Sequence, residues 1–559
     1  MPRQAAITKA ERSLHDQVNI LPRGQLIIVF SILSVTLLIN FIDQNGISTT
    51  LPVIAADLDA RATISWAGTA SLLANTTFQM LYGRLSDIFG RKTVFLAAIA
   101  LLSVADLLCG LSQNAAMFYA FRAVAGIGGG GLVNLTSIIV SDVVTLEQRG
   151  RYQGIIGSMI GLGNVVGPFL AAAISTRTTW RAFFWMLAPC GAVTFVLSYL
   201  YLPSKPRTAS FSESVTKVDW LGTLTSSIGI VFLLIPISGG GSYFAWDSPM
   251  VISMLAIGTL SLILFIIIEW RVAKLPMMPV EIYKNPVVAV MLTQSMILGS
   301  VYQAILYYVP LYLQNAHQFS MITSALIYMP LVGLQAAISV CSGFYISHFK
   351  RYGEVIWVGF AMWTLGAGLT LLYDRHTPIG IIIIPLATMG IGVGCIFQPT
   401  LVALQAHSPK SRRAVIISNR NFYRCAGGAC GLAISAAALQ ARLRTALPAE
   451  YAYLADSTYS LPEFGSEGIP ESVLDAYMAA SHAVFILQVP LIGLCLLGMV
   501  FIRDRGLETA EDKTSQQQQD AALVARDEAA RPEGTVGASN GVGEKPARRD
   551  SGADPVTKV

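Results

Sequence analysis

Charge is scarce in this chain. Only 13% of its 559 residues are Asp, Glu, Lys or Arg, and 53% are hydrophobic, whereas a soluble globular protein carries about 25% charged residues. This deficit excludes a cytosolic enzyme, a disordered scaffold and a nucleic-acid-binding protein, and the formal net charge is only +5. The basic residues stand in short clusters between long apolar runs, which is the charge distribution of a polytopic membrane protein.

Residues that hold metals, disulfides or nucleotides are also few or badly spaced. The seven cysteines lie in apolar stretches without a C-x-x-C pair, and the six histidines have no metal-ligand spacing. The glycine run Gly128–Gly131 has no lysine after it, so close helix packing explains it better than a phosphate-binding loop. We therefore expect no enzyme activity, no metal, no cofactor and no direct use of ATP.

Long apolar runs fill most of the chain. A membrane-spanning helix needs about 20 mostly apolar residues, and by that measure the chain holds about fourteen candidates. They lie near 26–46, 65–83, 93–112, 116–140, 153–175, 182–202, 220–239, 249–269, 287–313, 322–346, 354–373, 378–404, 413–440 and 481–502. Residues 1–24 are polar and show no cleavable signal, so the first run is expected to act as an uncleaved anchor.

Lysine and arginine collect in every second loop, for example at Arg91 and Lys92 and again at Arg149 and Arg151. Because short cytoplasmic loops carry this excess, an even number of spans places both termini in the cytoplasm. The expected organisation is a tail at 1–24, a six-helix bundle at 25–202, a cytoplasmic loop with an inserted helix pair at 203–280, a second bundle at 281–503 that includes an external loop at 441–480, and a tail at 504–559. The last segment is too polar to bury a core and is predicted to be disordered.

An internal repeat relates the two predicted bundles. Gly83–Lys92 and Gly343–Arg351 align at a constant offset, with Gly343 on Gly83, Phe349 on Phe89 and Arg351 on Arg91, while Ser347 replaces Asp87. Both segments fall in predicted cytoplasmic loops that lie eight spans apart. Two six-helix halves with an extra helix pair between them would give this separation. Secondary transporters are built from such internal repeats.

From Gln25 to Arg503 the sequence resembles the major facilitator superfamily, in particular its fourteen-span drug:proton antiporter branch of fungal and bacterial exporters. Residues 83–92 are similar to the loop signature G-x-L-a-D-x-x-G-r-k, with Gly83, Asp87, Gly90 and Arg91 at its key positions. The resemblance implies an all-α polytopic membrane protein with two six-helix bundles and an inserted helix pair.

Further motifs carry the same resemblance. Arg122 followed by Gly126 resembles the fourth-span motif, and residues 163–168, with Gly163, Gly167 and Pro168, resemble the fifth-span G-x-x-x-G-P signature of exporters. Ala171 and Ala172 replace the glycine pair that commonly ends that signature. Asp43 before Leu51–Pro52 resembles the first-span motif, and Asp219–Gly222 resembles the opening of the inserted pair.

Ionisable residues inside the apolar runs are the first site candidates, because a charge in the hydrocarbon costs about 2.5–3.5 kcal/mol. Asp43 shares one helical face with Asn40 and Gln44, which predicts a polar face toward a central cavity. There the carboxylate would bind a proton or a cationic substrate; the alternative is an acid near the helix end that external water hydrates.

Three further charged residues are candidates. Arg122 is expected either to pair with a carboxylate and couple protonation to conformation, or to snorkel to the headgroups. Asp106 is either the structural partner of Arg122 or a proton carrier. Arg424 lies on one helical face with Arg420 and too deep for comfortable snorkelling, which indicates an anionic substrate group, a carboxylate partner or a fixed structural ion pair.

Uncharged polar residues inside spans are predicted either to line the cavity or to join helices by hydrogen bonds. The cavity-lining candidates, besides Asn40 and Gln44, are Asn75, Gln79, Asn134, Gln294, Gln303, Gln335 and Gln398.

The glycine motifs are predicted conformational switches. Asp87 is expected to approach the positive end or the arginines around Arg149 and Arg151, and to latch the two helix pairs while the exporter faces outward. Gly163 and Gly167 are expected to form a side-chain-free strip at a bundle interface, next to the bend at Pro168.

Together these features predict a proton-coupled exporter of small, mostly amphipathic organic molecules such as drugs, toxins or secondary metabolites. The alternatives are an uptake or vacuolar carrier for amino acids, siderophores or organic acids, and a non-transporting membrane sensor of the same fold. The expected partners are a small-molecule substrate, protons and the lipid bilayer of the cell membrane, with the chain as a monomer and the vacuolar membrane as the other location.

Overall fold

The computed structural model describes residues 20–60, 63–64, 66–204, 211–239, 244–409, 412–456, 469–502, 504 and 506–507. These residues form helices joined by loops and turns, and they contain no strand. Most of the predicted tails at 1–24 and 504–559, and the middle of the predicted external loop at 441–480, lie outside the described residues.

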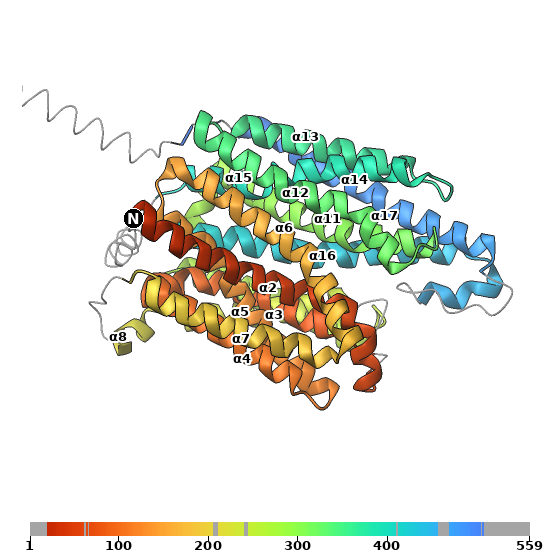
Figure 1. Ribbon diagram of the computed structural model, residues 1–559, viewed down its shortest axis with the longest axis horizontal. Helices are drawn as coiled ribbons and strands as arrows, with labels where there is room; N and C mark the ends of the chain where they lie inside the picture. Colours follow the sequence, from red (N-terminus) through yellow and green to blue (C-terminus); the bar gives the residue numbers. More distant parts are fainter. Residues whose placement is uncertain are drawn as a thin grey trace, which may run out of the picture. The chain divides into compact units, whose positions relative to one another are not determined.

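The first six helices match the first six predicted spans (Figure 1). They are α2 Arg23–Asp57, α3 Trp66–Phe89, α4 Arg91–Gly110, α5 Ala115–Val143, α6 Leu146–Arg177 and α7 Trp180–Tyr201. Helix α2 has 35 residues and continues well past the predicted end at residue 46.

The inserted segment and the second bundle follow in the predicted order. Their elements are α8 Phe211–Thr216, α9 Trp220–Gly239, α10 Pro249–Arg271, η1 Val280–Lys284, α11 Pro286–Asn315, α12 Met321–Phe349, α13 Gly353–Leu369, η2 Thr370–Leu372, α14 Ile379–Gly394, α15 Phe397–Ala406, α16 Arg413–Ala446, η4 Ala449–Asp456, α17 Glu471–Gly498 and η5 Met499–Phe501. The span predicted at 378–404 is two helices, because the regular helical hydrogen-bond pattern is interrupted at Cys395–Ile396.

Thirteen helical segments of the described residues are long and apolar enough to cross a membrane, with α14 and α15 forming one of them. Helix α3 is not among the thirteen, although it has 24 residues. Its sequence carries Asn75, Gln79, Arg84 and Asp87, and these polar residues are buried by other helices. It completes the predicted set of fourteen spans.

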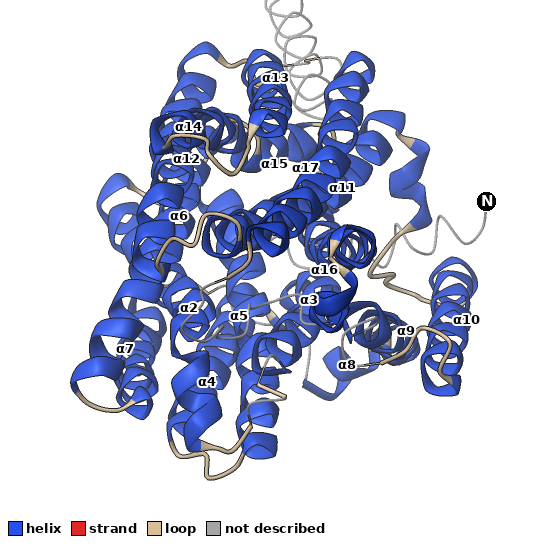
Figure 2. Cartoon of the chain, turned by 90° about the vertical axis from the view of Figure 1, so that its right-hand side faces the viewer, coloured by secondary structure: helices blue, strands red, loops and turns tan. Residues whose placement is uncertain are grey.

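The spans form two groups that meet along two helix pairs (Figure 2). Helices α2–α7 make the first group and α11–α17 the second. Helix α6 of the first group packs on α12 of the second, and α3 packs on α16. The inserted helix α9 contacts both α3 and α16, and α10 packs on α9.

The sequence repeat is visible in the backbone. Gly90 and Lys350 occupy the same place in the two repeats, and both have positive φ, 87° and 61° respectively. The preceding glycines both lie where the groups touch: a Cβ on Gly83 would lie 2.6 Å from Ser418 Oγ of α16, and Gly343 packs against the backbone of Gly150 in α6. The end of the helices that carries Gly90, Arg149 and Lys350 is called the basic end below.

Candidate functional site

A buried ion pair joins α2 and α5. Arg122 Nη1 donates to Asp43 Oδ1 at 2.6 Å, and the two side chains are only 1% and 4% exposed. Arg122 therefore does not snorkel to headgroups, so that alternative is wrong. Asp43 is not a hydrated helix-end acid either, since α2 continues to Asp57 and buries it.

Asp106 of α4 adds a second carboxyl group to this pair. Its side chain is buried next to the Asp43 carboxyl group, and its Oδ1 has no hydrogen-bond partner. Two carboxyl groups this close avoid repelling each other only when one of them carries a proton. Asp43, Asp106 and Arg122 can therefore hold one exchangeable proton beside one fixed positive charge.

Three of the predicted polar residues belong to one buried network. Gln79 Nε2 donates to Asn75 Oδ1 at 2.6 Å, and Asn134 Nδ2 donates to the Gln79 carbonyl oxygen at 2.7 Å. The network crosses to the second group because Asn421 Nδ2 of α16 donates to Asn134 Oδ1 at 2.6 Å. These residues therefore join α3, α5 and α16, and they lie beside Arg420.

Two arginines on one face of α16 stand without an acid. Arg420 is 5% exposed and donates to the Phe397 carbonyl oxygen, to Thr400 Oγ1 at 3.3 Å and to Asn421 Oδ1 at 3.1 Å. The Arg424 guanidinium lies 5.8 Å from the centre of the Phe397 ring, and its buried Nε has no hydrogen-bond partner. Neither arginine forms an ion pair with a carboxylate of the described residues, so the fixed structural ion pair considered for Arg424 is absent there.

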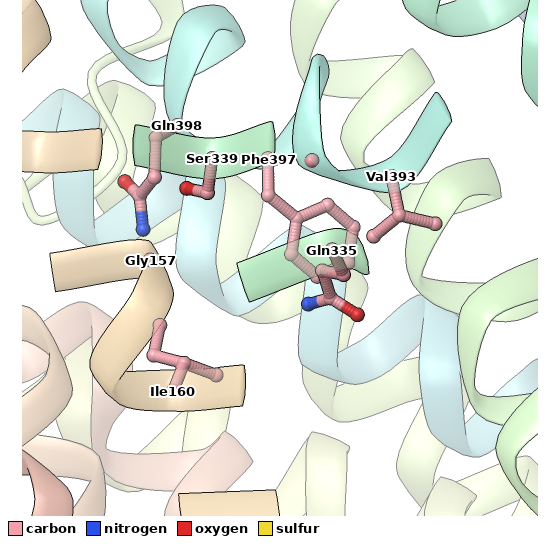
Figure 3. Close-up of a pocket in the computed structure, with 8 residues that line it drawn as sticks. Gly157, Ile160, Gln335, Ser339, Val393, Phe397 and Gln398 are labelled. Atoms are coloured by element: carbon pink, nitrogen blue, oxygen red, sulfur yellow. The ribbon is translucent and has the colours of Figure 1, made fainter. Parts of the chain in front are cut away.

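A small cavity lies where α6 meets the second group (Figure 3). It is lined by Gly157, Ile160, Gln335, Ser339, Val393, Gly394, Phe397 and Gln398. The Gln398 amide is directed toward α6 at Gly157, and its Oε1 has no hydrogen-bond partner. Two of the predicted cavity residues, Gln335 and Gln398, thus line a cavity at the break between α14 and α15.

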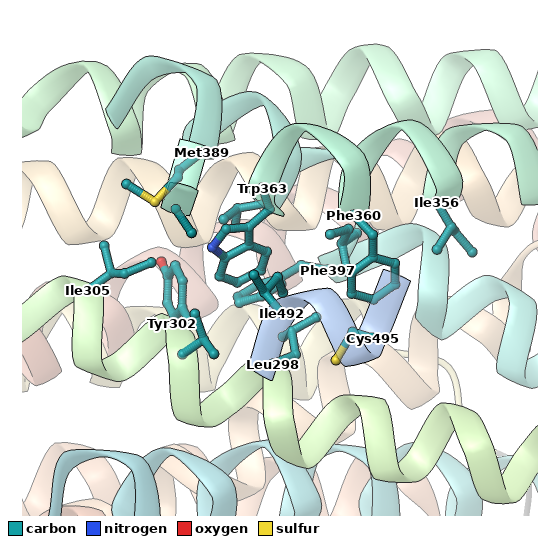
Figure 4. Close-up of a cluster of buried hydrophobic side chains, with 14 of the residues drawn as sticks. Leu298, Tyr302, Ile305, Ile356, Phe360, Trp363, Met389, Phe397, Ile492 and Cys495 are labelled. Carbon is teal, nitrogen blue, oxygen red and sulfur yellow. The ribbon is translucent and has the colours of Figure 1, made fainter. Parts of the chain in front are cut away.

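Tyr302 lies beside Trp363 and Phe397 in a buried cluster next to the cavity (Figure 4). Its hydroxyl donates to Gln335 Oε1 at 3.0 Å, and its ring centre lies 4.6 Å from that of Phe397 and 6.4 Å from that of Trp363. Phe397 in turn faces Arg424. Aromatic rings and amides therefore lie next to the cavity, and Phe397, which lines it, also faces the Arg424 guanidinium group.

The remaining polar candidates lie elsewhere. Asn40 is buried against Gly129 of α5, Gln44 is half-buried on α2, and Gln303 is half-buried against Gly428. Gln294 Nε2 donates to the Cys495 carbonyl oxygen at 2.8 Å, so it joins α11 to α17 and does not line the cavity of Figure 3.

The predicted contact of Asp87 with Arg149 or Arg151 is wrong. Asp87 pairs with Arg91 at 2.6 Å and lies 3.8 Å from Arg84, both of which are one turn away in sequence. Arg149 donates to the Ser141 carbonyl oxygen instead, and Arg151 lies over the Phe344 ring. Arg91 also pairs with Asp142 at 2.9 Å, so the loop motif ties α3, α4 and α5 together.

The predicted location of Gly163 and Gly167 at the interface between the two groups is also wrong. A Cβ on Gly163 would lie 2.5 Å from Phe41 Cβ, and one on Gly167 would lie 2.9 Å from the Ile42 carbonyl oxygen, so both glycines face α2 of their own group. A second set of glycines on α6 faces α12 across the group interface: Gly150, Gly154, Gly157 and Gly161. Helix α6 therefore has two glycine faces, and the one that faces the second group is not the predicted one.

Sequence reasoning missed Tyr302, Phe397, Thr400 and Asn421. None is charged, and each looks like an ordinary residue of an apolar span. One available signal was the glycine-rich stretch that ends at Gly394, because glycines weaken a helix and the chain breaks directly after them. The other was the position of Asn421 next to Arg420.

This arrangement is that of a secondary transporter: two helical groups related by a repeat, with polar and charged residues buried at their interface. The profile of the Major Facilitator Superfamily matches residues 33–432, and the chain belongs to this family. It is a multi-pass membrane transporter of a small molecule, not an enzyme, as the sequence predicted.

Curated relatives agree with this assignment. The chain is 48% identical to Citrate exporter 1 of Yarrowia lipolytica, over 91% of this chain and 76% of that protein. It is 43% identical to the MFS-type transporter clz4 of Cochliobolus lunatus, over 90% of both chains, and 31% identical to the efflux pump FUS6 of Gibberella fujikuroi, over 75% of this chain and 76% of that protein.

Solved structures show the same fold. The proton:xylose symporter XylE superposes with a TM-score of 0.59 over 88% of this chain and 99% of its own, at 14% identity. The human organic anion transporter MFSD10 superposes with a TM-score of 0.53 over 86% of this chain and 100% of its own, also at 14% identity.

Proposed function

We propose that the chain exports a small organic polycarboxylate, with citrate as the first compound to test. The observation that carries this proposal is the pair Arg420 and Arg424, two guanidinium groups within a membrane span that have no carboxylate partner among the described residues. The name of the 48% identical relative supports the same substrate class. Of the substrates considered from sequence, this selects organic acids and keeps the expected direction of export.

The chemistry of the site suits an anion. A guanidinium group presents a planar set of N–H donors that matches a carboxylate in bidentate geometry. Arg424 keeps its Nε free of protein partners, and Phe397 supports it from one side. Gln335, Gln398 and Tyr302 supply hydrogen-bonding groups for further carboxylate or hydroxyl oxygens of the substrate.

We further propose that Asp43, Asp106 and Arg122 bind the coupling proton. A proton carries about 2.3 kcal/mol per 100 mV of membrane potential. By the rule that about 1.4 kcal/mol corresponds to tenfold, this sustains a gradient of about fifty-fold. An anion leaving a negatively charged cytoplasm and a proton entering it move charge in the same direction, so the potential drives both.

The membrane topology is part of this proposal. The excess of lysine and arginine at the basic end indicates that this end faces the cytoplasm, together with both termini. The two groups touch there through Gly83 and Gly343. We infer from this contact a state closed toward the cytoplasm, and we propose that the chain works as a monomer in the cell membrane.

The test is exchange of labelled citrate in proteoliposomes. Arg424→Gln should reduce exchange by at least about tenfold, because one charge-assisted contact with a carboxylate contributes about 1.5–3 kcal/mol. The matched control is Arg442→Gln, which removes an exposed arginine from the far end of the same helix. Wild-type exchange in Arg424→Gln, or no citrate exchange by the wild type, would contradict the proposal.

A second candidate is the export of neutral or cationic amphipathic compounds, the drug and metabolite efflux expected from sequence. The aromatic rings of Tyr302, Trp363 and Phe397 beside the cavity favour it. In this case the wild type would export a hydrophobic dye, and Arg424→Gln would leave that export unchanged.

A further inference from the structure

Asn421 holds two hydrogen bonds that point to different groups of helices. Its Oδ1 accepts from Arg420 Nη1 at 3.1 Å within α16, and its Nδ2 donates to Asn134 Oδ1 of α5 at 2.6 Å. Asn421 is 2% exposed and Asn134 is fully buried. Both bonds are therefore shielded from competing water.

The orientation of the Asn421 amide follows from its partners. Asn134 donates through Nδ2 to the Gln79 carbonyl oxygen at 2.7 Å, so its Oδ1 is the atom left to face Asn421. A flipped Asn421 amide would direct its NH₂ group at the Arg420 guanidinium and place two donors together. Asn134 and Arg420 thus favour the same orientation of the Asn421 amide, and the bond to Asn134 holds the Asn421 side chain in place against Arg420.

The other bonds of Arg420 do not cross between the groups. Its Nη2 donates to the Phe397 carbonyl oxygen and to Thr400 Oγ1, both in α15 of the same group. Its Nε has no hydrogen-bond partner. Within the described residues, the Nη1 bond to Asn421 is the one that depends on the contact between α5 and α16.

We propose that Asn421 is a positioning residue whose hold on Arg420 depends on Asn134, so that the anion affinity of the site differs between the two transport states. This inference rests on the proposed role of Arg420 in binding the anion. With α5 and α16 in contact, Nη1 is committed to Asn421 and the anion is held weakly. When the groups separate at the basic end, Asn421 loses Asn134, and Nη1 turns to the anion and binds it more tightly.

The experiment compares citrate affinity from the two sides of the membrane. Half-saturating citrate is measured in vesicles of both orientations for the wild type, Asn134→Ala, Asn421→Ala and the double variant. In each single variant, the half-saturating citrate concentration at the side opposite the basic end should fall about tenfold, which means tighter binding there. The concentration at the basic end should change by less than about twofold. The double variant should match Asn421→Ala, because Asn134 acts only through Asn421.

Asn419→Ala is the matched control. Asn419 lies on the same helix, and its side chain donates to the Met277 carbonyl oxygen at 2.9 Å and to the Val415 carbonyl oxygen at 2.8 Å, without a hydrogen bond to Arg420. It should shift neither side selectively. Equal shifts on both sides, no shift, or additive effects in the double variant would overturn the inference. Asn134→Ser takes the place of Asn134→Ala if the latter does not fold.

A second measurement does not need citrate as the substrate. Phenylglyoxal modifies accessible guanidinium groups, and the modified residue is identified by mass spectrometry of the purified chain. Asn134→Ala should increase modification of Arg420 relative to the wild type, with Arg442 as an internal reference. If the wild type does not transport citrate, the proposed substrate is wrong, and this measurement alone decides whether Asn134 controls Arg420. Unchanged reactivity of Arg420 in Asn134→Ala would overturn the inference.

Discussion

At the scale of single residues, substitutions of the ionisable groups Asp43, Asp106 and Arg122 can separate an effect on proton coupling from an effect on folding. Asp43→Asn leaves Arg122 with Asp106 as its acid, so the variant should fold, lose pH-driven efflux and keep citrate exchange. Arg122→Gln leaves two acids without a cation and should lower stability by about 3–5 kcal/mol, the effect of breaking a buried pair. Adding Asp43→Asn to Arg122→Gln should recover part of the lost stability.

These variants are compared by size-exclusion profile after heating, by pH-driven accumulation and by exchange. Full pH-dependent accumulation in Asp43→Asn would mean that the proton travels elsewhere, with Asp106→Asn as the next variant. Loss of exchange together with accumulation would instead assign Asp43 to substrate binding.

Charged residues were the ones that the sequence could identify. Asp43, Arg122 and Arg424 stand out because a charge in an apolar span needs a partner. Their partners could not be read from sequence, since Asp43 and Arg122 meet only through packing of α2 on α5. The same limit explains why Asp87 was assigned to Arg149 or Arg151, although Arg91 lies nearer along the chain.

At the scale of helices, the two glycine faces of α6 should respond differently to added side chains. Gly154→Leu would drive a side chain into α12, because even a Cβ added at this glycine would lie 2.5 Å from the Ser339 carbonyl oxygen. Overpacking costs about 1–3 kcal/mol, and here it destabilises the closed contact between the two groups. The variant should fold but transport about tenfold less. Gly167→Leu faces α2 within its own group and should instead reduce the yield of folded protein.

Gly333→Leu is the control, because a Cβ on this α12 glycine meets no atom within 4 Å. It should fold and transport normally. Normal transport by Gly154→Leu would show that the contact between α6 and α12 does not limit the cycle.

The helices themselves were predictable because hydropathy and length define a span. All fourteen predicted segments contain a helix, including α3, which is too polar to meet a purely apolar criterion. The break between α14 and α15 and the choice of glycine face on α6 were not predictable. Both depend on which neighbouring helix packs against the segment, and hydropathy does not encode that.

At the scale of the whole molecule, alternating access requires the two groups to part at the basic end. The Arg151 backbone N–H donates to Ser347 Oγ at 2.9 Å, which brings α6 and α12 within reach of a disulfide. In a background without the exposed Cys190 and Cys341, Arg151→Cys with Ser347→Cys should cross-link on oxidation and stop citrate exchange. Reductant should restore it.

The control pair lies within one group. Arg375 pairs with Asp475 at 3.0 Å, and both belong to the second group. Joining Arg375→Cys to Asp475→Cys with a bifunctional methanethiosulfonate reagent, which spans the longer separation of an Arg–Asp pair, should therefore leave exchange near the wild-type rate, because relative motion of the groups does not stretch this contact. Exchange that continues through the cross-linked 151–347 pair would show that the groups do not separate at the basic end. The closed contact seen at Gly83 and Gly343 would then be permanent, and the path of the substrate would have to open elsewhere.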